Sequence, residues 1–370
     1  MVSTRYGEMP ALVVSNSNTP PNWVWNGFQW SQPAELQSGP AIELDDGTGP
    51  ALYMNWFSWI SKWNGQYWTP IAPSGACQSM AVPSSLAYYN DGSGMRLYAA
   101  CGNAVRRWNG QLWETIGSSF TGTLQLITVY ESGLYVAGTF QEINGISAFF
   151  RFAKWNGLAW EHVPELTGGD VKAMTVYDDG SGAALFVAGT FTSVGGLVQP
   201  FNRIAKWNGQ TWTALGSGLT GNGDSTRVKA LAVFDEGGNP ALYVSGDFSL
   251  AGGVPAGGLA KWNGSDWTGI LLGGYAEALT VFDDGARPAL YVRGDFNEHV
   301  RKYGCPEVVG DINGDGIRDG LDIVSFVWVW FDPSSATPQQ CRAMDGNLNG
   351  AIDSGDLPAF LDRLLNWSSP

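Results

Sequence analysis

The chain has 370 residues, 44% of them hydrophobic, so it is long enough to bury a large core. It carries 34 acidic against 20 basic residues, and the net charge of -14 argues against nucleic acid or an anionic membrane as a partner, because both require a basic face. No stretch approaches the roughly 20 apolar residues of a membrane span, so we expect no membrane span.

One hexapeptide, Trp-Asn-Gly-x-x-Trp, recurs along most of the chain in steps of 38 to 55 residues. Its copies begin at Trp25, Trp63, Trp108, Trp155, Trp207 and Trp262. Asn-Gly is a strong hairpin signal, because a type I′ turn needs two successive residues with positive φ. A hairpin at this period indicates one supersecondary unit repeated around a ring or along a solenoid. A residue needed once per unit usually packs against the next unit, so we interpret these tryptophans as structural.

The clearest unit spans residues 171–215 and contains four short apolar segments joined by turns. The predicted strands are 171–177, 184–191, 203–207 and 211–215, and none has a helical period. The second strand returns at 11–15, 51–57, 97–102, 133–140, 241–248 and 289–296. Seven units of four antiparallel strands predict an all-β protein, a seven-bladed β-propeller over residues 1–304, with six or eight blades left open. A β-solenoid is the competing architecture, but its coils are usually shorter.

The first and last units are incomplete. The seventh unit ends after a third strand at Tyr303, and few residues precede the second strand of the first unit. A propeller usually closes when an N-terminal strand completes its last blade. We therefore expect a longer precursor, in which that strand and an export signal lie upstream of Met1.

The repeated order Leu-Tyr-Val-x-Gly, Ala-Lys-Trp-Asn-Gly and x-x-Trp-x-x-Leu resembles the kelch repeat of galactose-oxidase-type propellers. The pair Ala-Gly-Thr-Phe and Ile-Ala-Lys-Trp-Asn-Gly is more similar to bacterial and fungal cell-surface propellers of the bud-site polarity-marker type. This resemblance covers residues 1–304 and implies a fold, not an activity, because kelch folds host enzymes, adaptors and surface proteins alike.

Acidic turns join the first and second strands of several units, for example Asp178-Asp179-Gly180 and Asp283-Asp284-Gly285. They lack the D-x-[DN]-x-[DN]-G spacing of calcium loops, so we interpret them as plain hairpin turns.

The 2–3 and 4–1 connections of an up-and-down blade share one face. The 2–3 connections are long and variable at 141–150, 192–202 and 249–258, and variable loops on a rigid scaffold are where binding sites usually lie. Trp23, Trp56 and Trp59 fall on this face outside the repeated motif and are candidates for stacking on sugar rings, with core or rim packing as the alternative. We expect a glycan or protein ligand there.

The four cysteines, Cys77, Cys101, Cys305 and Cys341, show no C-x-x-C spacing of a zinc or redox site. Cys77 and Cys101 lie at the outer ends of one predicted hairpin, and the other two bracket the first half of the C-terminal segment. Two such pairs suggest disulfides and an oxidising compartment, with four buried free thiols as the alternative. We therefore expect a secreted or cell-surface protein.

Residues 305–370 contain 10 acidic and 3 basic residues and form a separate predicted domain. Two loops carry oxygen ligands at the spacing of a calcium loop, with glycine at the sixth position and a backbone carbonyl at the seventh. The predicted ligands are Asp311, Asn313, Asp315, Ile317, Asp319 and Asp322, and then Asp345, Asn347, Asn349, Ala351, Asp353 and Asp356. Asn349 replaces a carboxylate, so we expect two Ca²⁺ sites of which the second is weaker. Acidic turns without metal are the alternative.

Each loop leads into an apolar segment, 323–331 and 357–365. Two loops with Asp at the twelfth position, each followed by one helix, resemble a type I dockerin over about residues 306–366. The resemblance implies a small α-helical, EF-hand-like module that binds two Ca²⁺ and docks onto a cohesin domain of another protein. The sequence departs from it at Gly320-Leu321 and Ser354-Gly355, where many dockerins carry a Ser-Thr pair for partner contact.

His162 and His299 are the only histidines, which argues against a two-His, two-Tyr copper site and against a Ser-His-Asp triad. A pair of glycosidase carboxylates stays open, because no acidic residue of the predicted propeller is marked by its setting. The leading hypothesis is a secreted, non-catalytic propeller that binds protein or glycan and carries a calcium-dependent docking module. The alternatives are a polysaccharide-degrading hydrolase in a dockerin-assembled complex and a purely structural cell-surface protein.

Overall fold

The computed structural model describes residues 2–6, 9–14, 23–25, 30–31, 41–45, 50–56, 59–63, 68–73, 85–117, 119–147, 151–195, 201–236, 240–271, 274–283, 288–295 and 300–303. Side chains are described for most of these residues from position 51 onward. The chain divides into two compact units, Met1–Gly285 with Tyr291–Arg301, and Ala286–Leu290 with Lys302–Pro370. The predicted C-terminal module at 305–370 lies outside the described residues.

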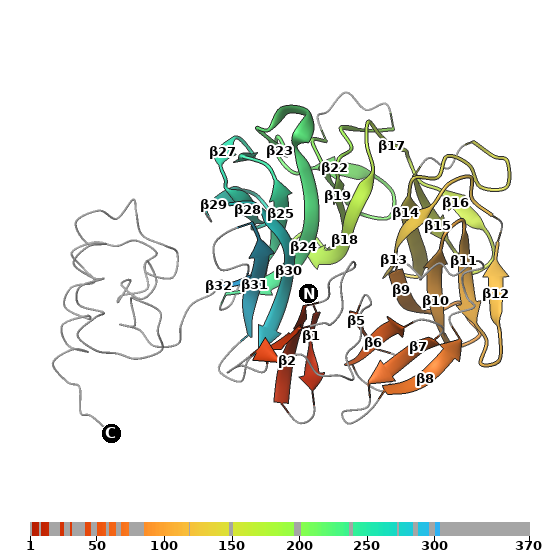
Figure 1. Ribbon diagram of the computed structural model, residues 1–370. Helices are drawn as coiled ribbons and strands as arrows, with labels where there is room; N and C mark the ends of the chain where they lie inside the picture. Colours follow the sequence, from red (N-terminus) through yellow and green to blue (C-terminus); the bar gives the residue numbers. More distant parts are fainter. Residues whose placement is uncertain are drawn as a thin grey trace, which may run out of the picture. The chain divides into compact units, whose positions relative to one another are not determined.

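The described secondary structure is almost entirely β-strand, and strands pair in chain order within successive sheets (Figure 1). Sheet 1 contains β1 (Val2–Tyr6), β2 (Met9–Val14), β3 (Trp23–Trp25) and β4 (Trp30–Ser31). Sheet 2 contains β5 (Ala41–Asp45), β6 (Pro50–Trp56), β7 (Trp59–Trp63) and β8 (Trp68–Pro73). Sheet 3 contains β9 (Ser85–Asn90), β10 (Met95–Cys101), β11 (Ala104–Trp108) and β12 (Trp113–Ile116).

The later sheets follow the same order. Sheet 4 contains β13 (Leu124–Tyr130), β14 (Gly133–Gly138), β15 (Phe152–Trp155) and β16 (Trp160–His162). Sheet 5 contains β18 (Val171–Asp178), β19 (Ala183–Gly189), β21 (Ile204–Trp207) and β22 (Trp212–Ala214). Sheet 6 contains β24 (Arg227–Asp235), β25 (Pro240–Asp247), β28 (Gly258–Trp262) and β29 (Trp267–Leu271). Sheet 7 contains β30 (Ala276–Asp283), β31 (Pro288–Gly294) and β32 (Val300–Tyr303).

Sheet 5 confirms the repeat unit predicted from the sequence. The four strands expected at 171–177, 184–191, 203–207 and 211–215 are β18, β19, β21 and β22, and each pairs antiparallel with the next. The same antiparallel order holds in sheets 1 to 4 and 6. The all-β class and the four-stranded unit are therefore correct.

The apolar cores of the described sheets lie between neighbours, because each second strand is buried on both faces. In β14, Leu134 and Val136 join a cluster with sheet 3, whereas Tyr135 and Ala137 join a cluster with sheet 5. Successive side chains of a strand point to opposite faces, so one strand serves two interfaces. This explains the unbroken apolar run of β14, all six residues of which are buried.

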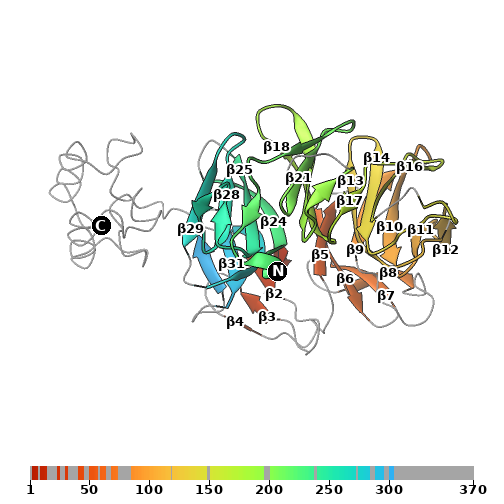
Figure 2. The same cartoon turned by 90° about the horizontal axis from the view of Figure 1, so that it is seen from above.

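The first strands of the sheets contact one another in chain order. β1 contacts β5, β5 contacts β9, β9 contacts β13, and the series continues through β18 and β24 to β30. β30 in turn contacts β1, so strands from the two ends of this series meet. Figures 1 and 2 show sheets 3 and 4 side by side from two directions, as their shared core requires.

The prediction of a type I′ turn at Trp-Asn-Gly-x-x-Trp is wrong for the described copies. The two tryptophans of each copy pair with each other, as Trp207 does with Trp212, so the loop has four residues instead of two. Only the glycine of each loop has positive φ, for example +92° at Gly209. The Asn208 Oδ1 instead accepts hydrogen bonds from the backbone N–H groups of Gln210 and Thr211, at 2.9 and 2.7 Å. Hydrogen bonds to the asparagine side chain, which are common in turns, thus stabilise a turn that needs a positive φ only at its glycine.

A type I′ turn does occur, at a different Asn-Gly pair. Asn144 and Gly145 have φ of 55° and 76° and lie between Ile143 and Ile146. The two isoleucines exchange backbone hydrogen bonds of 3.2 and 3.0 Å. The dipeptide alone therefore does not select the turn type, and the spacing of the flanking paired residues does.

Candidate functional site

The repeated tryptophans pack between sheets, as the sequence predicted. The two indoles of each described copy stack at a tilt with centroids 5.0 to 5.5 Å apart. Trp207 is 4% exposed, and its Nε1 donates to the Tyr135 hydroxyl of sheet 4 at 3.3 Å. Trp267 likewise donates to the Leu215 carbonyl oxygen, which follows sheet 5, at 2.9 Å. These residues are part of the scaffold and offer no binding surface.

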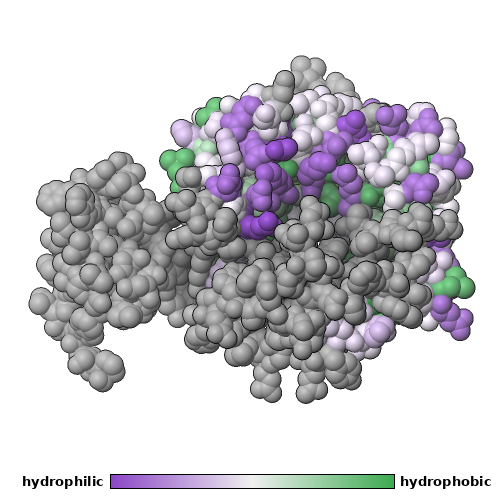
Figure 3. All heavy atoms as spheres, viewed as in Figure 1, coloured by the Kyte–Doolittle hydropathy of each residue, from purple (hydrophilic) through white to green (hydrophobic). Residues whose placement is uncertain are grey.

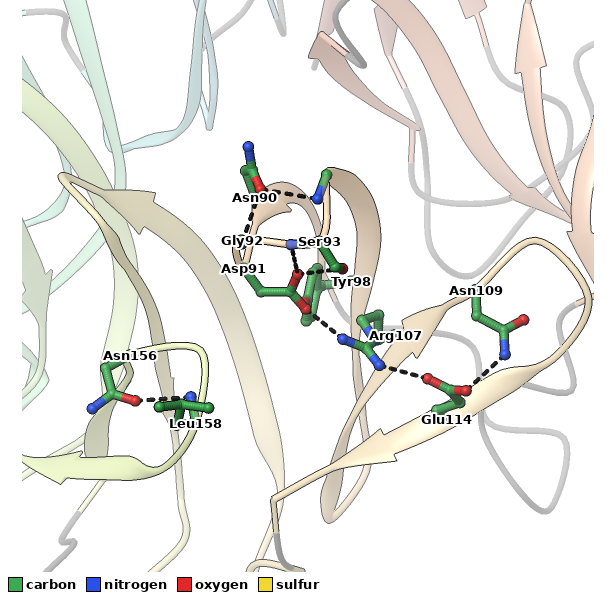
Figure 4. A network of polar contacts seen from close by, with 11 residues as sticks. Asn90, Asp91, Gly92, Ser93, Tyr98, Arg107, Asn109, Glu114, Asn156 and Leu158 are labelled. Atoms are coloured by element: carbon green, nitrogen blue, oxygen red, sulfur yellow. Dashed lines mark hydrogen bonds and ion pairs between the residues drawn. The ribbon is translucent and has the colours of Figure 1, made fainter.

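The turn between the first and second strands is also tied to the scaffold, as Figure 4 shows for sheet 3. The Asp91 carboxylate, 4% exposed, accepts hydrogen bonds from Ser93, from the Tyr98 hydroxyl at 2.7 Å and from the Arg107 guanidinium. Burial alone raises the pKa of Asp91, but these hydrogen bonds hold it well below its usual range. Arg107 also pairs with Glu114 at 2.7 Å.

Sheets 5 and 6 repeat this contact with a lysine in place of the arginine. Lys206 pairs with Asp179 at 2.6 Å, and Lys261 pairs with Glu236 at 2.9 Å. Each lysine comes from the Ala-Lys-Trp-Asn-Gly motif and lies 5.7 to 5.8 Å from the centroid of an aromatic ring on the second strand. The Asp178-Asp179 turn is therefore a hairpin turn stabilised by its own sheet, as predicted. Asp284 lies outside the described residues.

The opposite end of the sheets, where first strands begin and second strands end, contains a repeated β-bulge. The extra residues in sheets 4, 5 and 6 are Gln125, Lys172 and Lys229. A glycine of the second strand lies beside each bulge because the backbones approach closely: a Cβ on Gly189 would lie 2.0 Å from the Asp170 carbonyl oxygen. Bulges redirect side chains, and they often do so near functional sites.

The bulge residues of sheets 4 and 5 link the two sheets through polar side chains. The Lys172 Nζ lies 3.3 Å from the Gln125 Oε1 and 3.4 Å from an oxygen of Asp170. Arg151, which precedes β15 with φ of 65°, reaches the same Asp170 carboxylate at 3.4 Å. A left-handed φ is unfavourable for arginine, so the surrounding contacts must stabilise it.

In sheets 6 and 7 the corresponding positions form a continuous chain of ion pairs, which we call the charged rim: Arg227, Lys229, Asp247, Glu277 and Arg293. Asp247 pairs with Arg227 and, at 3.0 Å, with Lys229, which also lies 3.6 Å from Glu277. Arg293 completes the chain, 3.9 Å from Glu277. Burial raises the pKa of Asp247, but the hydrogen bonds from Arg227 and Lys229 outweigh it and lower the pKa overall.

The charged rim is accessible to solvent. The side chains of Arg227, Glu277 and Arg293 are 56%, 45% and 37% exposed. Figure 3 shows hydrophilic residues gathered over the part of the view in which Figure 1 draws β18, β24 and β25. This end of the sheets therefore presents a surface of alternating donors and acceptors.

Equivalent backbone positions at this end hold different residues from sheet to sheet. The residue two places before the bulge residue is Thr123 in sheet 4, Asp170 in sheet 5 and Arg227 in sheet 6. Tyr275 has the same place in the sequence of sheet 7. The bulge residue is Gln125, Lys172 or Lys229, and Glu277 takes its place in the sequence of β30. Packing alone would favour the same residues at each step, so this variation marks the bulge end as the candidate functional site.

Short strand pairs lie in the described parts of two of the long 2–3 connections predicted to form the ligand face. β20 (Ser193–Val194) pairs with β17 (Leu166–Thr167), and β26 (Leu250–Ala251) pairs with β23 (Leu219–Thr220) and β27 (Val254–Pro255). A 3₁₀ turn, η2 (Gly223–Ser225), follows β23. Each connection thus packs against the segment that enters its own sheet.

The structure places the backbone of the predicted ligand-face tryptophans at this same end. Trp23 begins β3, and Trp56 pairs with Trp59 across the turn between β6 and β7. Their side chains are not among the described ones, so their role stays a prediction.

The other predicted site residues are mostly outside the described residues. This holds for all twelve calcium ligands and for Cys77, Cys305, Cys341 and His299. Cys101, at the end of β10, is disulfide-bonded, and its pairing with Cys77 stays a prediction. Over the described ranges no group of three or more His, Cys, Asp or Glu residues could hold a metal ion, and no helix is long and apolar enough to cross a membrane.

The sequence did not predict the charged rim, because its residues are dispersed along the chain and form no sequence motif. Its members come from four strands, β24, β25, β30 and β31. The available signal was the change of residue type at equivalent positions, such as Asp170, Arg227 and Tyr275, just before the repeated apolar residues of the first strands.

Comparisons with known proteins bear on the fold alone. No protein-family model matches the chain, and no curated protein matches it either. Among solved structures it is similar to PorZ, described as a bacterial surface component of the type-IX secretion system of Porphyromonas gingivalis, with 10% identity and a TM-score of 0.51 over 82% of this chain and 46% of that one. The chain thus spans less than half of PorZ.

A second structure, BBS1N in complex with ARL6DN, is 12% identical with a TM-score of 0.51, over 80% of this chain and 86% of that one. PorZ is a β-propeller-like protein, and the sheet order and inter-sheet cores described above fit the same architecture. The chain therefore has a β-propeller fold.

Proposed function

We propose that this chain is a non-catalytic, ligand-binding propeller of seven kelch-like blades, joined to a calcium-dependent docking module. The observation that carries the proposal is the charged rim, a set of ion-paired and solvent-accessible side chains at one end of the sheets. The other end repeats the same acid–base contact in sheets 3, 5 and 6. Side chains that vary where the backbone repeats are not required for packing and are available for recognition.

Seven blades are supported by the contacts among first strands. Seven sheets of three or four strands follow one another within the described residues, and β30 contacts β1. Radial closure of this kind leaves few exposed strand edges. The repeated Lys-Trp-Asn-Gly segment supports the kelch-like assignment.

Binding is tested by retention on a panel of plant and algal polysaccharides and on candidate protein ligands. We expect retention of the intact chain without release of reducing ends. Reducing ends that accumulate in proportion to protein would instead support the polysaccharide-degrading hydrolase. A chain that neither binds nor cleaves any of these would contradict the proposal and favour a purely structural surface protein.

The C-terminal module is proposed to bind two Ca²⁺ and, by its dockerin resemblance, a cohesin-like domain of another protein. Isothermal titration of the full chain should give two sites of unequal affinity, because the second loop has Asn349 in place of a carboxylate. The Asp356→Ala variant should lose the weaker site, and the Asp322→Ala variant the stronger one. Absence of any calcium binding would contradict the module's assignment without touching the propeller.

A secreted or cell-surface location is supported by the disulfide at Cys101, since disulfides persist in oxidising compartments. Quantifying free thiols in the unreduced, denatured chain tests this, and we expect none. Four titratable thiols would contradict the location.

A further inference from the structure

Tyr275 is the only exposed aromatic residue among those whose side chains the structure describes. It is 45% exposed, whereas the described tryptophans, phenylalanines and other tyrosines are buried or half-buried. An aromatic ring left in solvent on a protein that buries its aromatic residues between sheets is available for a ligand. Tyr275 directly precedes β30, at the bulge end of the sheets.

The surroundings of Tyr275 are polar. Glu277 of the charged rim lies two residues along the chain, and the Asn222 Nδ2 is 3.5 Å from the Tyr275 hydroxyl. Lys229 and Arg293 both pair with Glu277, at 3.6 and 3.9 Å. Tyr275 thus lies at the start of the strand that also carries Glu277, a member of the chain of ion pairs.

This combination fits a neutral sugar ring. Every cation of the charged rim lies within ion-pair distance of a carboxylate, and three cations share two carboxylates, so the rim carries only one unit of net positive charge. Vicinal hydroxyls each donate and accept hydrogen bonds, so they can use both kinds of partner at once. A protein interface would instead need an apolar core around its aromatic anchor, whereas the Tyr275 hydroxyl contacts the polar Asn222 and the charged Glu277 lies two residues along the chain.

We infer that Tyr275 and the adjoining charged rim form a carbohydrate subsite, in which a neutral sugar ring stacks on Tyr275 while its hydroxyls bond to Glu277, Lys229 and Arg293. The inference rests on the proposed ligand-binding function and names its site and ligand class. It assigns the site to Tyr275 and not to Trp23, Trp56 or Trp59.

The test is affinity electrophoresis of the full chain in gels containing soluble xylan, mixed-linkage β-glucan, galactomannan or polygalacturonate. We expect the wild-type chain to be retarded by at least one neutral polysaccharide. The retardation should change little between low and high salt, because a neutral polysaccharide carries no charge whose attraction salt could screen. Tyr275→Ala should weaken retention about tenfold, equivalent to about 1.4 kcal/mol. The retention of Tyr275→Phe, which keeps the ring, should stay within about twofold of the wild type, since stacking uses the face of the aromatic ring.

Leu158→Ala is the control, because Leu158 is a large side chain, 90% exposed, in the loop between β15 and β16 at the opposite end of the sheets. It should bind like the wild type, and thermal unfolding of all variants should confirm that they fold. Retention by neutral polysaccharide that Tyr275→Ala leaves unchanged would overturn this inference while the proposed function stands. Retention by polygalacturonate alone, lost at high salt, would also overturn it. No retention of the wild-type chain by any polysaccharide would contradict the glycan-binding function itself.

Discussion

The two ends of the sheets are built by different rules. At the end with the 1–2 turns, Asp91, Asp179 and Glu236 each accept from a cation on the third strand of their own sheet. At the other end the backbone repeats its bulge, but the residue two places before the bulge changes from Thr123 to Asp170 to Arg227. Repetition thus marks the contacts that hold the scaffold together, and variation on a repeated backbone marks the surface that is available for recognition.

Removing a repeated tryptophan should produce the largest effect. Trp207 is 4% exposed and packs in the core between sheets 4 and 5. Trp207→Ala should lower the free energy of unfolding by about 3–5 kcal/mol, because a large cavity forms and the Tyr135 hydroxyl loses its donor. Urea unfolding followed by tryptophan fluorescence measures this. The exposed Leu158, replaced by alanine, is the control and should change stability little.

Breaking one repeated ion pair should be the next largest effect. Asp179 and Lys206 are only 6% and 13% exposed, so Asp179→Asn leaves a nearly buried ammonium without its carboxylate. We expect a loss of about 2 kcal/mol in the free energy of unfolding, below the value for a fully buried pair because some solvent reaches the lysine. A change within the error of the unfolding measurement would mean that this end does not hold the sheets together.

The same pair makes stability depend on pH. Burial raises the pKa of Asp179, but the hydrogen bonds from Lys206 and Ser181 outweigh it, so the pKa in the folded chain lies below its ordinary value. A depressed folded pKa contributes stability that is fully present above the unfolded pKa and is lost as pH falls through the folded pKa. Acid unfolding between about pH 5 and 2 should therefore have a shallower slope in Asp179→Asn than in the wild-type chain. Equal slopes would show that the carboxylate titrates alike in both states.

Changing a rim charge should affect stability least. Lys229 is 26% exposed and its partner Glu277 is 45% exposed, so solvent weakens their attraction. Lys229→Met should lower the free energy of unfolding by about 0.5–1 kcal/mol, the usual range for accessible pairs. If Lys229→Met destabilised the chain as much as Asp179→Asn does, the rim would be structural and the contrast between the two ends would fail.

The sequence alone determined the architecture of the repeat, because strand alternation and turn residues are local signals. The four strands of sheet 5 lie where the apolar segments of residues 171–215 predicted them. The structural interpretation of the tryptophans also followed from their regular spacing, and the core between sheets confirmed it. The type I′ turn predicted at Asn208-Gly209 was wrong, whereas such a turn occurs at Asn144-Gly145, where none was predicted, because turn type depends on which flanking residues pair.

Only the tertiary structure decided where the candidate site lies. Arg227, Asp247, Glu277 and Arg293 are separated by 20 or more residues along the chain in most pairs, and stacking of sheets 6 and 7 brings them together. No local sequence pattern predicts that these residues lie close together, since each one alone is an ordinary charged residue near a strand end. The sequence did not predict exposure either. Tyr275 is one of 13 tyrosines, and only the packing of the sheets distinguishes its exposed ring from the buried and half-buried tyrosines whose side chains the structure describes.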